Sequence, residues 1–223
     1  MPSWKSQRMS KDDMLATVDL LLAEARRVSH LTVDPTLKRE VVSYCNETLA
    51  GLKAAKKATE DDSARNRLLA AELAVMGASA EMQMWQHLED GDCEGAWGCL
   101  VEAEDAVHAA GIAHVDGSAY QVDAQRRLML EGTLFPPQVF MSTGMIVERD
   151  SCSICSAPYD ECDHVKGRAY GGELCTRNIE QAKMLEVSIV EHPSDRRCRV
   201  TNFDGFDTMT LAKEQPANQV TQG

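Results

Sequence analysis

The sequence predicts a mainly α-helical fold, in which an antiparallel helical bundle over residues 8–131 is followed by a small ribbon-like β unit over residues 136–207. Two observations support this prediction. Aromatic residues make up only 5% of the chain while Met is frequent, which favours helices over an aromatic-filled β-sandwich. Helical stripes of apolar residues fill the first part, whereas Pro, β-branched residues and clustered cysteines mark the second.

Five helices are expected in the first part. Ser10 can cap a helix over residues 10–31, and Asp34-Pro35 starts a second helix that runs to about residue 58. A third helix follows over residues 63–88, a fourth over 94–110 and a fifth over 118–131. The connections between them are short, as in antiparallel bundles. The side chains expected to pack the third helix on the fourth are Met82, Met84, Trp85 and Trp97.

The chain changes character after residue 132. Phe135-Pro136-Pro137 is a rigid break, and residues 139–147 are β-prone. Residues 185–191 alternate apolar and polar side chains, and residues 198–203 are expected to pair back on them as a second strand. Residues 208–223 are expected to be a disordered tail.

Charge and hydropathy exclude several classes of protein. The formal net charge is −12, with 14 Lys/Arg against 22 Asp/Glu in residues 1–135 and 8 against 12 in residues 148–207. Neither part has the basic surface that dominates nucleic-acid affinity, so a nucleic-acid partner is not expected. No apolar run approaches the roughly 20 residues of a membrane span, and no signal-peptide pattern is seen, so we expect a cytoplasmic protein.

Four of the eight cysteines lie in residues 152–175, beside a histidine. In a chain that is not secreted, clustered Cys with His indicates a metal site, and scattered Cys act as small apolar residues. A C-x2-C turn points both sulfur atoms to one side, and a further Cys and His supply the other half of a tetrahedral zinc site. Buried apolar cysteines or a redox pair are the alternatives, but the segment is polar and no βαβ unit precedes it.

Five residues compete for four positions around the predicted zinc ion. The set Cys152, Cys155, Cys162 and His164 closes the site with the shortest loops, which costs the least ordering entropy. This set places Cys162 and His164 two residues apart and requires a turn at residue 163. Cys175 is therefore kept as a reserve ligand that could replace Cys162 or His164. Four protein ligands leave no open position, so we expect one structural zinc ion per chain.

Residues 150–200 resemble a zinc cassette of phage-derived and uncharacterised bacterial proteins. The matching positions are Cys152-x2-Cys155-x3-Tyr159-x2-Cys162-x-His164-x2-Gly167-x2-Tyr170-x-Gly172 and Val187-Ser188-Ile189-Val190-x2-Pro193. The resemblance implies a small metal-stabilised unit in a phage or mobile-element setting. It carries over no catalytic residue.

The same segment also resembles a compressed HNH nuclease. The positions concerned are Cys152-x2-Cys155, Asp163-His164-Val165, Gly171-Gly172 and Leu174-Cys175-x2-Asn178. In that family, the His after Asp activates water, a later Asn orients the hairpin and two C-x2-C pairs bind structural zinc. Here the second pair is missing, because Asn178 stands where its second Cys would fall.

The sequence thus favours a non-enzymatic, zinc-stabilised module for protein interaction or assembly, with another protein or a second copy of the chain as partner. The alternative is a degenerate HNH-like, metal-dependent nuclease. The two readings differ in whether His164 is a ligand in a closed site or faces an open cleft.

Overall fold

The computed structural model describes residues 10–30, 33–203 and 206–208. The first two helices begin where the sequence predicts. Ser10 caps α1 (Lys11–Val28) in a capping box with Asp13, and Asp34 caps α2 (Pro35–Lys57) with Pro at the first helical position. Most of the expected tail, 209–223, lies outside the described residues.

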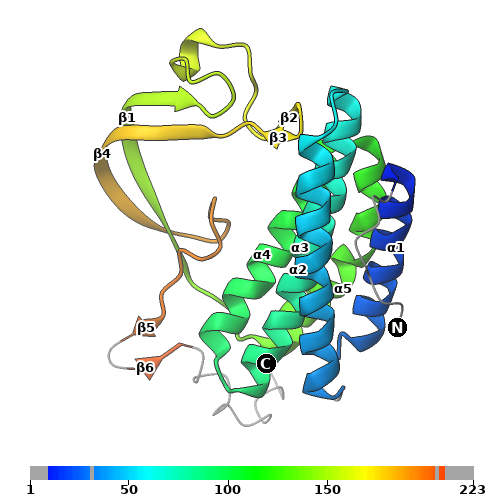
Figure 1. The fold of residues 1–223 in the computed structure, drawn as a ribbon. Helices are drawn as coiled ribbons and strands as arrows, with labels where there is room; N and C mark the ends of the chain where they lie inside the picture. The colour runs from blue at the N-terminus through cyan, green and yellow to red at the C-terminus, as the bar shows by residue number, and fades with distance from the viewer. Residues whose placement is uncertain (1–9, 31–32, 204–205, 209–223) are drawn as a thin grey trace.

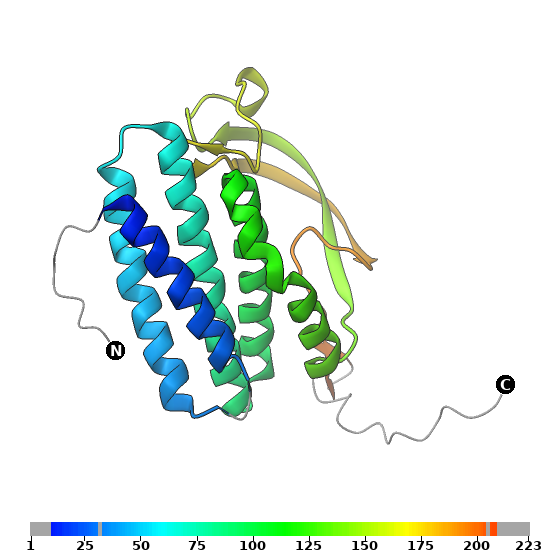
Figure 2. The ribbon, with the colours of Figure 1, turned by 90° about the vertical axis from the view of Figure 1, so that its right-hand side faces the viewer.

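The central helix of the bundle is α3 (Asp62–Glu89), which packs against α1, α2 and α4 (Cys93–Ala113; Figures 1 and 2). Asp61 and Asp92 cap α3 and α4, each accepting a hydrogen bond from a backbone N–H of the first turn. The expected core residues Met82, Met84, Trp85 and Trp97 are buried. Their partners are not confined to α3 and α4: the indole N–H of Trp85 donates to Ser29, and Trp97 lies against Phe135 and Phe140. None of the described helices is long and apolar enough to cross a membrane.

The fifth helix differs from the prediction. A 3-10 helix, η1 (Val115–Asp123), comes first, and α5 (Ala124–Leu134) then continues three residues beyond the predicted end. Gly117 lies so close to α4 that an added Cβ would be 1.8 Å from the carbonyl oxygen of Ala110. This close packing of η1 on α4 depends on tertiary contacts, which a helical repeat in the sequence does not reveal.

The predicted strand pairing was wrong. β1 (Phe140–Cys152) pairs antiparallel with β4 (Arg177–Val190), so the strand expected at residues 185–191 begins eight residues earlier. Residues 198–200 run along the start of β1 instead, where the N–H of Met141 donates to Cys198 and the N–H of Val200 donates to Val139, both at 2.8 Å. The β1–β4 ladder offers far more cross-strand pairs than residues 198–203 could.

Two further strand pairs complete the β unit: β2 (Ala169–Tyr170) with β3 (Glu173–Leu174), and β5 (Asn202–Phe203) with β6 (Phe206–Asp207). The β1–β4 ribbon bends away from α4, and the β2–β3 hairpin returns to the helices near the start of α3 (Figure 1). The chain is therefore mainly helical with a small C-terminal antiparallel sheet, which confirms the predicted fold class.

The base of the ribbon is held on the helices by Trp97. Its ring lies 5.4 Å from that of Phe135 and 6.1 Å from that of Phe140, between ring centroids. The guanidinium groups of Arg196 and Arg199 lie 5.2 and 5.7 Å from the same ring. These arginines also form ion pairs with acidic residues of the helices: Arg196 with Glu104 and Glu131, and Arg199 with Glu94.

Candidate metal centre

The first half of the site is a tight turn at the end of β1. The carbonyl oxygen of Cys152 accepts from the N–H of Ser156 at 2.8 Å, and the N–H of Cys152 donates to Ala157 at 2.9 Å. Ser156 adopts a positive φ of 60°, which is uncommon outside glycine and allows the chain to reverse. The N–H of Ile154 lies 3.4 Å from the sulfur of Cys152 and can donate to it. The turn thus brings Cys152 and Cys155 to one side of the loop.

The second half is the irregular segment after η2 (Tyr159–Glu161), which carries Cys162 and His164. Two tyrosine hydroxyls hold this segment in place. Tyr170 accepts from the N–H of Val165 at 2.9 Å, and Tyr159 accepts from the N–H of Lys166 at 2.8 Å. The Tyr170 ring also packs edge-on against the His164 ring at 4.6 Å. The imidazole is therefore fixed by its neighbours.

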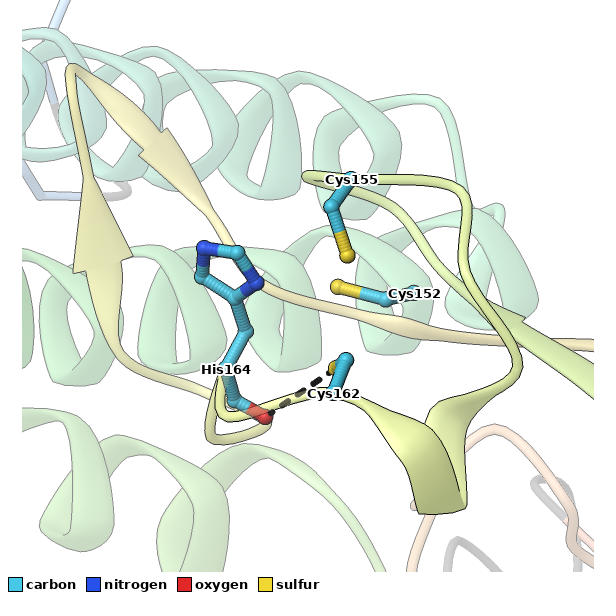
Figure 3. A group of neighbouring side chains, drawn as sticks. All are labelled: Cys152, Cys155, Cys162 and His164. Carbon is cyan, nitrogen blue, oxygen red and sulfur yellow. Dashed lines mark hydrogen bonds between the residues drawn. The ribbon is translucent and has the colours of Figure 1, made fainter.

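The structure brings the four favoured ligands together. One donor atom from each of Cys152, Cys155, Cys162 and His164 lies within 4.8 Å of all the others. The sulfur atoms and one imidazole nitrogen converge on a common point (Figure 3). These four residues could hold a metal ion.

Two observations show that the residues fit a metal ion. Nδ1 of His164 is buried and has no hydrogen-bond partner among the described residues, although a buried polar atom normally has one. Three soft sulfur donors and one imidazole nitrogen are also a donor set that transition metals prefer. A metal ion at the common point would give Nδ1 of His164 a partner and would be bound by the three sulfur atoms.

The environment shifts the pKa values of two of these thiols in opposite directions. Burial raises the pKa of Cys152, but the N–H groups of Cys155 and Ile154 and the neighbouring thiols outweigh it and lower the pKa to about 6. Burial, together with the neighbouring Cys152, raises the pKa of Cys162 to about 11. The first thiol is thus prepared for the thiolate form in which cysteine binds metals.

Cys175 lies beside the cluster but outside the group of four. It is buried, and its sulfur is 3.8 Å from the sulfur of Cys152. Its backbone pairs with the preceding loop: its N–H donates to Arg168 and its carbonyl oxygen accepts from Gly167, both at 2.8 Å. Its position is consistent with both roles predicted for it, a reserve ligand or a packing residue.

The β2–β3 hairpin holds the cluster against the helices. Gly171 and Gly172 form its two-residue turn with φ of 55° and 85°, a conformation that glycine adopts without strain. Asn66 of α3 accepts from the N–H of Gly172 at 2.8 Å and donates to Ala169 at 3.4 Å. Ala169 and Leu174 also pack on a small buried cluster of Leu69, Ala70 and Ala113.

Asn66 is the contact that sequence reasoning missed. It lies 106 residues before Gly172, and an isolated Asn within a helical pattern carries no signal of a distant partner.

Comparison of the chain with protein-family models, with curated proteins and with solved structures finds no match.

Proposed function

We propose that this protein is a non-enzymatic module for protein interaction or assembly, whose C-terminal β unit is stabilised by one structural zinc ion. The observation that carries the proposal is the convergence of three cysteines and one histidine on a single point. The resemblance to the phage-related cassette supports a phage or mobile-element setting, and the sequence supports a cytoplasmic location.

Zinc is the metal that the donor set favours. Cys3His is a common set for structural zinc, with Zn–S bonds of about 2.3 Å. Tetrahedral coordination at that bond length separates the sulfur atoms by about 3.8 Å. Since the donor atoms lie within 4.8 Å of one another, side-chain shifts of about 1 Å would bring them onto one ion.

The position of the site supports a structural role. Four protein ligands leave no coordination position for water or substrate. The ion would join the turn after β1 to the loop that carries His164, and the β2–β3 hairpin holds this assembly on α3. Zinc would thus fix the far end of the ribbon, as Trp97 and its arginines fix the near end.

The ribbon itself supports an interaction role. Most of β4 is exposed, including large apolar side chains such as Met184, Val187 and Ile189 at 64, 55 and 77% exposure. A contiguous group of exposed apolar residues marks an interaction surface more often than isolated ones do.

The HNH-like alternative finds less support. A hollow of about 370 Å³ beside the turn is lined by four carboxylates and only two guanidinium groups, which disfavours binding of a phosphodiester. These charged residues are Glu148, Asp150, Asp160 and Glu180, with Arg149 and Arg177. Nδ1 of His164 is buried, so this nitrogen is not open to a water molecule that it could activate.

The two functions predict opposite results for His164→Ala. If His164 is a zinc ligand, the variant loses zinc and thermal stability, and the wild type does not cleave DNA with Mg²⁺ or Mn²⁺. If His164 is catalytic, the wild type cleaves DNA with Mg²⁺ or Mn²⁺, and the variant keeps its fold and its zinc but loses this cleavage. We expect the first result; an active wild-type nuclease and a zinc-replete, stable variant would overturn the proposal.

A further inference from the structure

One side of the β1–β4 ribbon is apolar along more than half its length. The ladder places four pairs of residues opposite one another: Met141 with Ile189, Thr143 with Val187, Met145 with Met184, and Val147 with Ala182. Because directly opposite residues point to the same side and alternate residues share a face, these eight residues form one surface. We call it the outer apolar face.

An irregularity in β4 is needed to build this face. Gly144 pairs with Glu186 and Met145 with Met184, so Leu185 is an extra residue in the ladder. Without this bulge, Met184 and Val187 would point to opposite sides of the ribbon. The extra residue keeps the apolar residues of β4 that precede it and those that follow it on the same side of the ribbon.

The opposite face of the same segment is mostly polar. It carries Ser142, Lys183, Glu186 and Ser188, with Ile146 as its one large apolar residue between the ends. Phe140 and Val190, at the base of this face, pack into the core of the bundle. The ribbon therefore directs its polar side toward its own helices at the base and its apolar side away from them.

Nothing in the described part of the chain covers the outer apolar face. The exposed fractions of five of its large side chains run from 36% for Met141 to 77% for Ile189, Val147 is half-buried, and none of the eight residues belongs to a buried cluster. A two-stranded ribbon is marginally stable alone and normally packs against another layer.

We propose that a second copy of this chain covers the face, by two ribbons packing on each other about a two-fold axis. This inference rests on the proposed interaction function and names its partner. The face carries no charged side chain, so a two-fold contact opposes no like charges even though each chain has a net charge of −12. The result is a four-stranded, two-layered sandwich with apolar side chains between the layers.

The size of the face sets the strength of this contact. At about 3.3 Å per residue and about 10 Å for the width of two strands, its footprint is roughly 250 Å², and protruding side chains roughly double the accessible area. Two faces would bury about 1,000 Å² in total, the lower limit for a specific interface. A contact of this size is weak, so the dimer should form only as the protein concentration rises.

Pairing through the outer edge of β4 is the competing arrangement. No described backbone group outside β1 bonds to residues 178–189. However, the ladder is irregular at three places, and bulges of this kind hinder edge-to-edge pairing. The face is thus the better docking surface.

The test is the mass of the full-length, zinc-loaded chain in solution, by sedimentation and light scattering from about 1 to about 200 μM. The wild type should rise from 24.5 kDa toward twice that mass. Val187→Lys, at 55% exposure on the outer apolar face, should raise the dimer dissociation constant at least about tenfold. Ile146→Lys, at 53% exposure on the opposite face, should change it less than about twofold.

Circular dichroism and zinc content establish that both variants are folded. A wild type that stays at 24.5 kDa throughout, or a dimer that both variants weaken equally or neither weakens, overturns the second-copy inference. A photo-crosslinker at position 184 in the native host distinguishes failure of the second-copy inference from failure of the proposed interaction function. If the wild type is monomeric and crosslinks to a different protein, self-association is contradicted but the interaction function is supported. If the wild type neither self-associates nor forms a crosslink, both the inference and the proposed function lose support.

Discussion

The turn of the β2–β3 hairpin gives the most exact test of how the metal unit is held on the helices. Gly172 has φ of 85°, and a Cβ added there would lie 2.9 Å from Cδ of Lys56 and 3.1 Å from Cβ of Arg65. Gly167 has nearly the same φ, 86°, but an added Cβ would meet nothing within 4 Å. Alanine at each position therefore introduces similar backbone strain but different packing.

The expected magnitudes follow from these contacts. A left-handed conformation costs a non-glycine residue about 1–2 kcal/mol, and this term is common to both variants. Gly172→Ala must also displace atoms of two helices, and overpacking of this kind costs about 1–3 kcal/mol. We therefore expect Gly172→Ala to be less stable than Gly167→Ala by about 1–3 kcal/mol.

Guanidinium denaturation of the zinc-loaded chain, followed by circular dichroism, measures the free energy of unfolding of both variants. Equal losses, within about 0.5 kcal/mol, would refute the reasoning, because they would mean that the hairpin turn does not press on α2 and α3 in solution.

Two further predictions concern the attachment of the β unit. Arg199→Met should cost about 1–3 kcal/mol, because it removes a buried guanidinium that pairs with the exposed Glu94 and donates to Gln138. Arg197→Met, at a half-exposed site, should cost less than about 1 kcal/mol. Thermal denaturation that ranks them the other way contradicts the role of Trp97 and its arginines as an anchor. Zinc removal with a strong chelator should speed amide hydrogen exchange in residues 152–176 and leave α1–α4 protected, since metal binding in small units is local folding free energy. Loss of protection throughout the helices would instead show that bundle and metal unit unfold together.

The helices could be predicted because their signals are local. Ser10 and Asp34-Pro35 lie at the observed starts of α1 and α2, and each is read from a few neighbouring residues. The 3-10 segment could not be foreseen, because it depends on Gly117 lying against the carbonyl oxygen of Ala110.

The strand pairing failed for a related reason. Residues 185–191 alternate in the sequence, but alternation does not identify the partner strand, and the bulge at Leu185 interrupts the alternation within β4. The favoured partner, residues 198–203, was near in sequence, while β1 is separated from β4 by the whole metal loop. Pairing across such a loop is decided by the length of the ladder, which the local pattern does not show.

The candidate site was the most predictable feature after the helices. Its four residues lie within 13 positions, and short loops limit how they can meet. The sequence could not show that Tyr159 and Tyr170 hold the loop, nor that Asn66 anchors the hairpin, because these contacts depend on the folded backbone.

The most direct test of the central claim is the zinc content of the purified full-length chain, measured by elemental mass spectrometry on the wild type and on Cys155→Ser. The account predicts close to one zinc ion per wild-type chain. It also predicts loss of that ion from Cys155→Ser, together with loss of order in the β unit, because Cys155 is one of four converging ligands. A metal-free wild type whose β unit is intact and unfolds cooperatively would contradict it.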